Sequence, residues 1–572
     1  MSTEFHIRGG EKIIAIIKSF SATEKVIFGC FVVVALACAL SLAWTVNKHF
    51  LVSVPSHGGS LAEGIVGLPR SINPVLAFTD VDLDLSALIY SGLMKYEGDK
   101  LVPDLAQEYT VSTDGLVYTF TLKDDLRFHD GVPLTTDDVE FTIQKVQDAV
   151  IKSPHYADWA NISTKKISPT EIQFILKQPY TPFLSNVTLG ILPKHIWSKI
   201  QSDQFIFSQY NIEPIGSGPY QLESMQRDNG GIPIHYTLSS FSRYQGGEAF
   251  ISQLYIYFYP NEKALVDAYS KGIVEAMART SPAEAVRIAS TTPTATILHT
   301  PLPRIFGIFF NQNQAPLFIQ KEVRQALDAA TDKEYIINKV LLGYGVTSNG
   351  PIPRNIALPD TPVSTQKAQD ILNKAGWVMN SNGVMEKKDK KGGAQTLEFS
   401  IATADSPDLK RIAEIIKSQW EKIGAKVTIK VFEFGDLYQN VIATRKYDAL
   451  LFGESIGKDL DLYAFWHSSQ RNSPGLNVAL YVNSKVDRLL EEARVATDEK
   501  SRQGSYAQFE KIIQDELPAI FLYSPEFIYV IPDKVRNLHF DSIIPSNRFY
   551  GISTWYITTD SVWKVFADKN NN

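Results

Sequence analysis

The chain has 572 residues, of which 44% are hydrophobic and 21% are charged, and its formal net charge is −6. This is ordinary globular composition, and the length predicts several domains or one large split architecture. Because there is no basic surplus to neutralise a phosphate backbone, we expect no nucleic-acid partner. The only cysteines, Cys30 and Cys38, lie in an apolar N-terminal stretch. The remaining chain therefore has no disulfide, thiolate metal site or catalytic cysteine.

Residues 26–46 form an uncharged stretch of 21 residues. A helix of that length spans the hydrocarbon core of a bilayer, which is about 30 Å thick. Four basic residues precede the stretch, whereas Lys48 is the only Lys or Arg between it and Arg70. The positive-inside rule therefore predicts that residues 1–25 are cytoplasmic, that 26–46 form a transmembrane anchor, and that everything beyond lies outside the cytoplasmic membrane.

Other interpretations of this stretch compete with a retained anchor. A cleaved signal peptide is one, because Ala35-Leu36-Ala37 and Ser41-Leu42-Ala43 are small-x-small patterns. A lipoprotein signal ending at Cys38 is another, although Ala35 stands where such signals usually have Leu. We favour the retained anchor because the apolar run is longer than an ordinary signal sequence. Residues 47–60 contain several Ser, Gly and Pro residues, and we expect them to form a flexible tether.

Farther along, helix and strand patterns alternate. Residues 117–123 have the period of a strand, and Thr135 with Asp138 has capping-box spacing at the start of a helix. An apolar stripe over residues 409–423 predicts a long helix that ends at Gly424. After it we expect a strand over 427–431, a short helix over 436–441 and a strand over 447–452. This order predicts an α/β fold with a partly parallel sheet.

Several stretches resemble the family 5 extracellular solute-binding proteins, the oligopeptide-, dipeptide- and nickel-binding components of ABC importers. The most specific is residues 112–139, STDGLVYTFTLKDDLRFHDGVPLTTDDV, which departs from the family pattern by having Lys123 in place of Arg. The joint match of many ordered motifs is more specific than any one of them. The other matching stretches are residues 71–74 (SINP), 89–93 (IYSGL), 101–106 (LVPDLA), 215–220 (IGSGPY), 323–327 (VRQAL) and 368–377 (AQDILNKAGW).

The resemblance implies a large two-lobed fold of the periplasmic-binding-protein type with three subdomains. Two strands crossing between the lobes would let them close around a ligand like a hinge. Residues 301–303 and 524–525 are the expected crossing points. The implied boundaries are 61–92, 214–303 and 523–572 for lobe 1, 93–213 for a subdomain inserted into lobe 1, and 304–522 for lobe 2.

The resemblance also places a ligand site on a strand of lobe 2, where a peptide satisfies its backbone donors and acceptors. Family members have a G-W-x-x-D stretch there, and the matching residues are Gly453, Glu454, Ser455, Ile456 and Gly457. Glu454 stands where peptide binders often have Trp. Gly457 stands where their Asp pairs with the N-terminal ammonium of the peptide.

Asp459 and Asp461 follow this stretch closely. Either one of them replaces the missing carboxylate, or the ligand lacks a free amine. Capping of the helix that begins near residue 462 is the alternative role for both. Trp466 is either a wall of the pocket or a core residue.

Other residues complete the expected site. Phe78 and Thr79 follow the Asn73-Pro74 motif where lobe 1 would touch the ligand. Asn311 lies just past the first crossing and is expected to bond the ligand backbone, a cap or the hinge. Tyr523 lies at the return crossing and could close over the ligand.

Residues 453–457 also spell G-x-S-x-G between a strand and a helix, which is the setting of a hydrolase nucleophile elbow at Ser455. His467 and His539 follow it with acidic residues between. Isolated five-residue matches are common, however, and the binding family accounts for the same segment. The chain is therefore predicted not to be an enzyme.

The predicted function is a membrane-tethered, monomeric solute-binding protein without a cofactor. It would capture a peptide-like solute outside the cell and deliver it to an ABC permease with its ATPase subunits. A sensor, or a binder of an oligosaccharide or metal chelate, would use the same cleft and remains an alternative.

Overall fold

The computed structural model describes residues 16–98, 100–353, 363–388, 393–457, 460–496, 498–538 and 545–564. The chain divides into two compact units. Residues 1–57 and 558–572 belong to the first unit, and residues 58–557 form the second.

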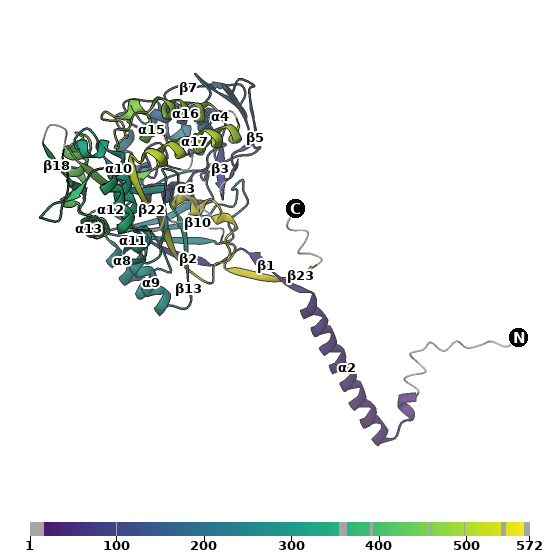
Figure 1. Ribbon diagram of the computed structural model, residues 1–572. Coiled ribbons are helices and arrows are strands. Elements are labelled where there is room, and N and C mark those ends of the chain that lie inside the picture. Colours follow the sequence, from purple (N-terminus) through teal and green to yellow (C-terminus); the bar gives the residue numbers. More distant parts are fainter. Residues whose placement is uncertain are drawn as a thin grey trace. The chain divides into compact units, whose positions relative to one another are not determined.

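The first unit contains a long helix and a two-stranded ribbon. Helix α2 (Ala22–Phe50) is long and apolar enough to cross a membrane, and none of its residues is buried. Its start is closed by a capping box, in which Ser21 and Glu24 each bond the other's backbone N–H. Strand β1 (Leu51–Ser56) follows at once and pairs antiparallel with β23 (Thr558–Trp563) (Figure 1).

The predicted flexible tether at residues 47–60 was wrong through Ser56, because this segment is helix and then strand. The Ser and Pro residues suggested a linker, but a partner strand from the C-terminal end of the chain satisfies the backbone of β1. Residues 558–563, which the sequence analysis placed in lobe 1 with the rest of 523–572, form β23 in the first unit.

Two large hydrophobic cores of the second unit show its two-lobed fold. One core is built from residues between Ile305 and Tyr523. The other is built from residues between Leu61 and Ala278 together with residues between Phe527 and Trp555. We call the parts around these cores lobe 2 and lobe 1, respectively. The two cores share no residue, so each lobe is stabilised by its own burial of apolar surface.

Lobe 1 is a mixed sheet with helices against it. Its strands run in the order β22-β12-β2-β11-β10-β9, and β13 also pairs with β22. The elements are β2 (Ser60–Val66), β9 (Tyr220–Arg227), β10 (Pro233–Ser240), β11 (Gln253–Tyr259), β12 (Ala276–Ala278), β13 (Ala295–Pro301), α3 (Asp80–Ile89), α8 (Glu262–Ser270) and α9 (Pro282–Thr291).

Residues 94–211, here called the inserted subdomain, contribute to the same core as lobe 1. They build a four-stranded antiparallel sheet in the order β5-β6-β8-β7. The elements are β3 (Met94–Glu97), β4 (Lys100–Pro103), β5 (Ala106–Val111), β6 (Val117–Leu122), β7 (Ile162–Lys166), β8 (Glu171–Leu176), α4 (Thr136–Val146), α5 (Tyr156–Trp159), α6 (Phe183–Asn186) and α7 (Lys194–Trp197).

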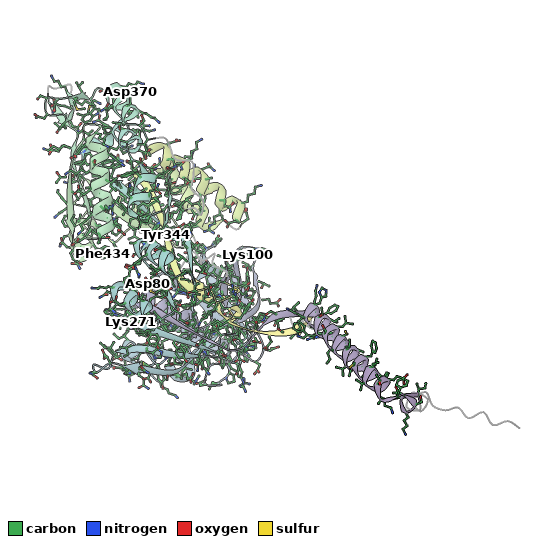
Figure 2. The ribbon with its side chains drawn as sticks, turned by 90° about the horizontal axis from the view of Figure 1, so that it is seen from below. Asp80, Lys100, Lys271, Tyr344, Asp370 and Phe434 are labelled. Atoms are coloured by element: carbon green, nitrogen blue, oxygen red, sulfur yellow. The ribbon has the colours of Figure 1, made fainter. Side chains whose placement is uncertain are left out.

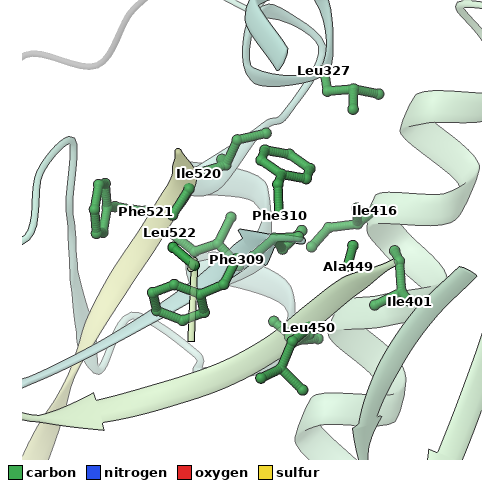
Figure 3. Close-up of a cluster of buried hydrophobic side chains, with 14 of the residues drawn as sticks. Phe309, Phe310, Leu327, Ile401, Ile416, Ala449, Leu450, Ile520, Phe521 and Leu522 are labelled. Atoms are coloured by element: carbon green, nitrogen blue, oxygen red, sulfur yellow. The ribbon is translucent and has the colours of Figure 1, made fainter. Parts of the chain in front are cut away.

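Lobe 2 has a sheet in the order β20-β19-β21-β14-β22, with helices packed against it. Its core between these strands and helices is shown in Figure 3. The strands are β14 (Arg304–Phe310), β15 (Gly345–Thr347), β16 (Val378–Met379), β17 (Met385–Lys388), β18 (Ala394–Thr396), β19 (Glu398–Ala404), β20 (Lys426–Phe432), β21 (Ala449–Ser455) and β22 (Ala519–Pro532). The helices are α10 (Lys321–Ala329), α11 (Lys333–Val340), α12 (Thr365–Lys374), α13 (Pro407–Glu421), α14 (Phe434–Asp436), α15 (Tyr463–Trp466), α16 (Ser484–Val495) and α17 (Glu499–Glu516).

Strand β22 runs through both lobes. Its residues 519–523 pair with β14 of lobe 2, and its residues 526–532 pair with β13 of lobe 1. The exchange of partners falls at residues 524–525, beside the link 302–303 between β13 and β14. At residues 524–525 β22 pairs with the short strand β15 of lobe 2, so the strand is continuous across the exchange.

Local predictions met mixed outcomes. The capping box of Thr135 and Asp138 is confirmed, as is the helix over the 409–423 stripe, which is α13. Gly424 adopts a positive φ of 84°, as a C-terminal stop requires. The strand predicted at 447–452 lies instead at 449–455. The short helix predicted over 436–441 is present: α14 continues directly into a π-helix at Leu437–Ile442.

Candidate functional site

Strand β21 has one paired edge and one edge that is largely open. It pairs with β14 along its whole length, from Ala449 to Ser455. On the other side its ladder with β19 contains only Ala449 and Leu450, and the Thr403 hydroxyl then donates to the Leu451 carbonyl at 3.1 Å. Beyond that bond the two parallel strands diverge, at the carboxyl ends where open α/β sheets bind ligands.

The direction of the backbone groups on the open edge follows from the antiparallel pairing with β14. Ile456 N–H donates to the Pro303 carbonyl at 2.8 Å, which makes residue 456 a hydrogen-bonded position. Such positions alternate along an antiparallel pair, so Glu454 also bonds toward β14. Gly453 and Ser455 therefore direct their N–H and C=O groups to the open edge, where no described strand pairs with them.

Aromatic side chains lie around this edge. The rings of Phe434 and Phe452 stack with centroids 6.4 Å apart. Phe434 is 62% exposed and Tyr438 is 49% exposed, so both rings present apolar surface to solvent. In Figure 2, Phe434 lies at the end of lobe 2 that is nearer to Asp80 of lobe 1, with Tyr344 in the region between the lobes.

Gly453 is held against a stacked aromatic pair. Phe306 and Tyr523 stack with centroids 5.1 Å apart, and a Cβ on Gly453 would lie 2.8 Å from the Phe306 ring. Any other residue at 453 would displace this ring or the strand. Tyr523 is only 3% exposed, and burial raises the pKa of its hydroxyl. Tyr523 is thus a buried residue that packs against Phe306, and Phe306 in turn packs against Gly453 of β21.

The Glu454 side chain is buried within lobe 2. It is 4% exposed, and both carboxyl oxygens lack a hydrogen-bond partner among the described residues. Burial raises the pKa of Glu454 well above its usual value, and the nearby indole of Trp466 opposes this only in part. The carboxyl therefore binds a proton more tightly than a solvent-exposed glutamic acid does. Trp466 is fully buried, in agreement with the core interpretation.

Between residues 456 and 461, just after β21, the described residues carry no unpaired carboxylate. Ile456 is buried, and Gly457 turns the chain with a φ of 75°. Asp459 lies outside the described residues. Asp461 is paired with Arg494, with Oδ2 and Nη2 2.6 Å apart, and it also accepts a bond from Tyr463 N–H. Asp461 is not the N-cap of α15, which is Leu462, so its carboxylate forms an ion pair and a local bond to Tyr463 N–H just before the helix.

A cavity of about 550 Å³ lies between the inserted subdomain and lobe 2. Asp158, Lys177 and Tyr180 line one side, and Asp461 and Arg494 line the other. Desolvation raises the pKa of Asp158, and the charge of Asp461 across the cavity raises it further. The described lobes thus enclose a polar space beside the segment that follows β21.

The same two parts are joined by hydrogen bonds at the edge of this cavity. Thr181 N–H donates to the Arg494 carbonyl at 3.2 Å, and the Thr181 hydroxyl donates to the Ala496 carbonyl. Backbone-directed bonds of this kind can break and re-form without leaving a buried charge, which suits a contact between moving lobes.

The lobe 1 residues predicted for the site begin helix α3. Phe78 is 77% exposed. Thr79 is the N-cap of α3: its hydroxyl accepts a bond from Asp82 N–H at 3.2 Å and donates to the Asp82 carboxylate at 2.7 Å. The next residue, Asp80, pairs with Arg279 at 3.0 Å.

Asn311 is engaged within lobe 2. It is 1% exposed; its amide nitrogen donates to the Arg445 carbonyl at 2.8 Å, and its amide oxygen accepts bonds from Asn313 and Gln314 N–H at 3.1 Å. These bonds hold the turn that follows β14 within lobe 2, and they do not cap a helix.

Comparison with known proteins identifies the family. The model of bacterial extracellular solute-binding proteins, family 5 (middle part), matches residues 100–475. The chain belongs to this family. The oligopeptide-binding protein AppA of Bacillus subtilis is 27% identical over 536 residues, which cover 91% of this chain and 96% of that protein.

Solved structures agree. The structure of AppA from B. subtilis in complex with a nonapeptide has a TM-score of 0.67 at 27% identity, and the match covers 88% of this chain and all of that one. NikZ from Campylobacter jejuni in complex with Ni(L-His) has a TM-score of 0.69 at 26% identity, over 87% of this chain and 99% of that one. Members of this family thus hold different solutes on a shared fold.

Sequence reasoning missed the exposed aromatic residues Phe434 and Tyr438 and the half-buried Phe452. A signal existed, because Phe434 comes two residues after strand β20, where parallel strands end at the ligand-binding edge. Sequence reasoning also ended this strand at residue 452, where the mostly apolar run stops, whereas β21 continues to Ser455. In fact Gly453 is required by close packing in the strand.

Proposed function

We propose that this chain is a membrane-anchored, extracytoplasmic solute-binding protein that binds a peptide or peptide-like solute along β21 and delivers it to an ABC permease. The observation that carries the proposal is the open edge of β21, with the backbone groups of Gly453 and Ser455 directed to it. Family membership supports solute binding, and the apolar helix α2 supports anchoring.

An extended peptide fits such an edge because its backbone donors and acceptors complete the sheet without regard to its side chains. The exposed rings of Phe434 and Tyr438 supply apolar contacts for side chains of the ligand. The carboxyl of Glu454 is turned inward and Asp461 is already paired. As far as the described residues go, which leave out Asp459, recognition thus rests on the ligand backbone more than on a charged amino terminus.

Chemistry at Ser455 is not part of this proposal. Ser455 is the last residue of β21 and pairs with Arg304, so it does not lie in a strained turn. Among the described residues, no hydrogen bond joins it to a histidine, and His467 Nδ1 bonds the Ser469 hydroxyl at 2.8 Å instead. Conversion of peptides or esters that is lost in Ser455→Ala would contradict this.

The first experiment is native mass spectrometry of the full chain in detergent, followed by calorimetric titration with any peptides found. Ser455→Pro removes one N–H from the open edge and leaves the bonds to β14 in place, since edge positions tolerate proline. We expect it to weaken peptide binding by about tenfold, the worth of a net hydrogen bond of up to ~1.5 kcal/mol.

Ser455→Ala is the matched control, because it keeps the N–H and should bind like the wild type. Equal affinity of Ser455→Pro and wild type would refute binding along β21. Recovery of a metal chelate or carbohydrate in place of peptides would refute the peptide assignment.

A further inference from the structure

The first unit brings the end of the chain back to the end of the apolar helix. Trp563, at the end of β23, lies opposite Leu51 in the ribbon formed by β1 and β23. Its indole N–H donates to the side-chain oxygen of Asn47 at 2.7 Å. Its ring stacks on Phe50, with centroids 6.2 Å apart and planes inclined by 27°. A residue from the far end of the sequence is therefore held against the last turn of α2.

From these contacts we propose that Trp563 and Phe50, with Trp44 on α2, form an aromatic anchor in the lipid headgroup region. Strand β23 would then be a membrane-surface element. The inference rests on the proposed retention of α2 as an anchor. It assigns the C-terminal strand an interaction with lipid that the binding function does not require.

The exposure of these side chains supports this assignment. Trp44 is 67% exposed, Phe50 is 46% exposed and Trp563 is 45% exposed. The polar atom of the Trp563 ring is already satisfied by Asn47, so what remains exposed is mostly apolar ring. Tryptophan rings of this kind are enriched where hydrocarbon meets headgroups.

The positions along the helix fit the same layer. From Val26 to Ala43 the helix rises about 27 Å, which nearly fills the hydrocarbon core. Trp44 then lies at the boundary, and Phe50 lies ~9 Å farther out, within reach of the headgroups. The Lys48 ammonium is 5.4 Å from the Trp44 ring centroid and suits lipid phosphates at this depth.

A lipid surface is the occupant that continuity favours, because the exposed rings adjoin the helix that would cross the bilayer. A second copy of the chain would instead cover them laterally. The unit that binds solute would then be joined covalently to a membrane-bound ribbon at both of its ends, after residue 57 and before residue 558. A single flexible tether would not give this double attachment.

The test uses the full chain with Cys30→Ala and Cys38→Ala, reconstituted in vesicles of phosphatidylcholine and phosphatidylglycerol. A spin label is placed at Ser561→Cys, near the helix end of β23, or at Thr559→Cys, two residues farther away on the same face. We expect the 561 label to be several-fold more accessible to oxygen than to a water-soluble nickel complex, and the 559 label to show the reverse.

Trp563→Ser should shift the 561 label toward the aqueous profile, whereas Trp563→Phe, which keeps an aromatic ring, should not. A cysteine pair at Val52 and Val562, which face each other in the ribbon, reports by disulfide formation whether the ribbon stays paired in each variant. Aqueous profiles at both label sites, with the protein floating with the vesicles, would overturn this inference alone. Loss of flotation would overturn the anchor and the inference together.

Discussion

The two lobes bury carboxyl groups in opposite ways. In lobe 1, Glu63 and Asp84 are at most 2% exposed and both contact Arg548, at 2.6 Å and 2.9 Å, respectively. In lobe 2, Glu454 is buried without a hydrogen-bond partner among the described residues. The first arrangement compensates charge within the core, whereas in the second burial disfavours the charged form and raises the pKa of Glu454.

Further bonds extend the lobe 1 network, although Arg548 Nε has no hydrogen-bond partner among the described residues. Asp84 also accepts from Arg279 at 2.7 Å, and the Tyr529 hydroxyl donates to Glu63 at 2.8 Å. Burial by itself would raise the pKa of Asp84, but Arg548 and Arg279 outweigh it and hold the pKa below its usual value. The network ties β2, α3, β22 and the segment around residue 548 into one platform.

The contrast suggests different tasks for the two interiors. In lobe 1 the buried charges include Asp84 of α3, the helix that begins just after Phe78. The buried carboxylates Glu63 and Asp84 both pair with Arg548. Glu454 lies on the strand proposed to bind ligand, and a buried carboxyl without a hydrogen-bond partner among the described residues costs stability. Buried polar groups that lack partners are expected mainly where function requires them.

The largest expected effect comes from breaking the lobe 1 network. Arg548→Met removes the cation and leaves two buried carboxylates, and loss of one partner of a buried pair costs about 3–5 kcal/mol. Denaturant unfolding of the full chain measures this. Arg243→Met, at an exposed arginine, is the control and should change stability by less than ~0.5 kcal/mol. Equal effects of the two variants would show that the network does not hold lobe 1 together.

A smaller effect of opposite sign is expected in lobe 2. Because its folded pKa is raised, Glu454 binds a proton more tightly in the folded than in the unfolded chain. Its contribution is therefore most favourable below the unfolded pKa of about 4.5 and is lost as pH rises toward the folded pKa. Glu454→Gln should thus stabilise the protein by ~1–3 kcal/mol at pH 8 and have little effect at pH 4.

Unfolding by denaturant at both pH values tests this sign. Glu414→Gln, on the exposed face of α13, serves as the control because its carboxyl faces solvent. If Glu454→Gln destabilised the protein at pH 8, the carboxyl would have an ionic partner or a water that the contacts do not reveal, and the comparison of the lobes would fail.

Much of the fold could be predicted, because its determinants are local in sequence. The capping box at Thr135 and the stripe of α13 depend on spacings of three and four residues. The carboxylates that pair with Arg548 lie 464 and 485 residues away in the chain, so no local sequence pattern predicts them. The partner of β1 is β23, which lies far away in the sequence. Without that partner in view, the Ser and Pro residues of β1 were interpreted as a linker.

The candidate site was predicted as a segment but not in its geometry. The stretch 453–457 was located by resemblance, whereas the inward direction of Glu454 depends on strand register, which one residue can reverse. Asp461 was expected either to bind an amine or to cap a helix. Arg494, which occupies it, lies 33 residues farther on and on another helix.

The smallest expected effect on stability is at the pair of Asp461 and Arg494 in lobe 2, because both side chains are partly exposed. Asp461→Asn should reduce stability by only about 0.5–1 kcal/mol, because solvent screens the pair and Arg494 keeps its stacking over Tyr463 at 3.8 Å.

Removal of the Asp461 charge should also lower the pKa of Asp158 across the cavity, which a titration followed by NMR would detect. Asp405→Asn, at an exposed pair with Lys410, is the control and should leave Asp158 unchanged. A loss of stability above ~3 kcal/mol in Asp461→Asn would mean that this lobe 2 pair behaves like the buried ion pairs of lobe 1. The proposed difference between the interiors of the two lobes would then be wrong.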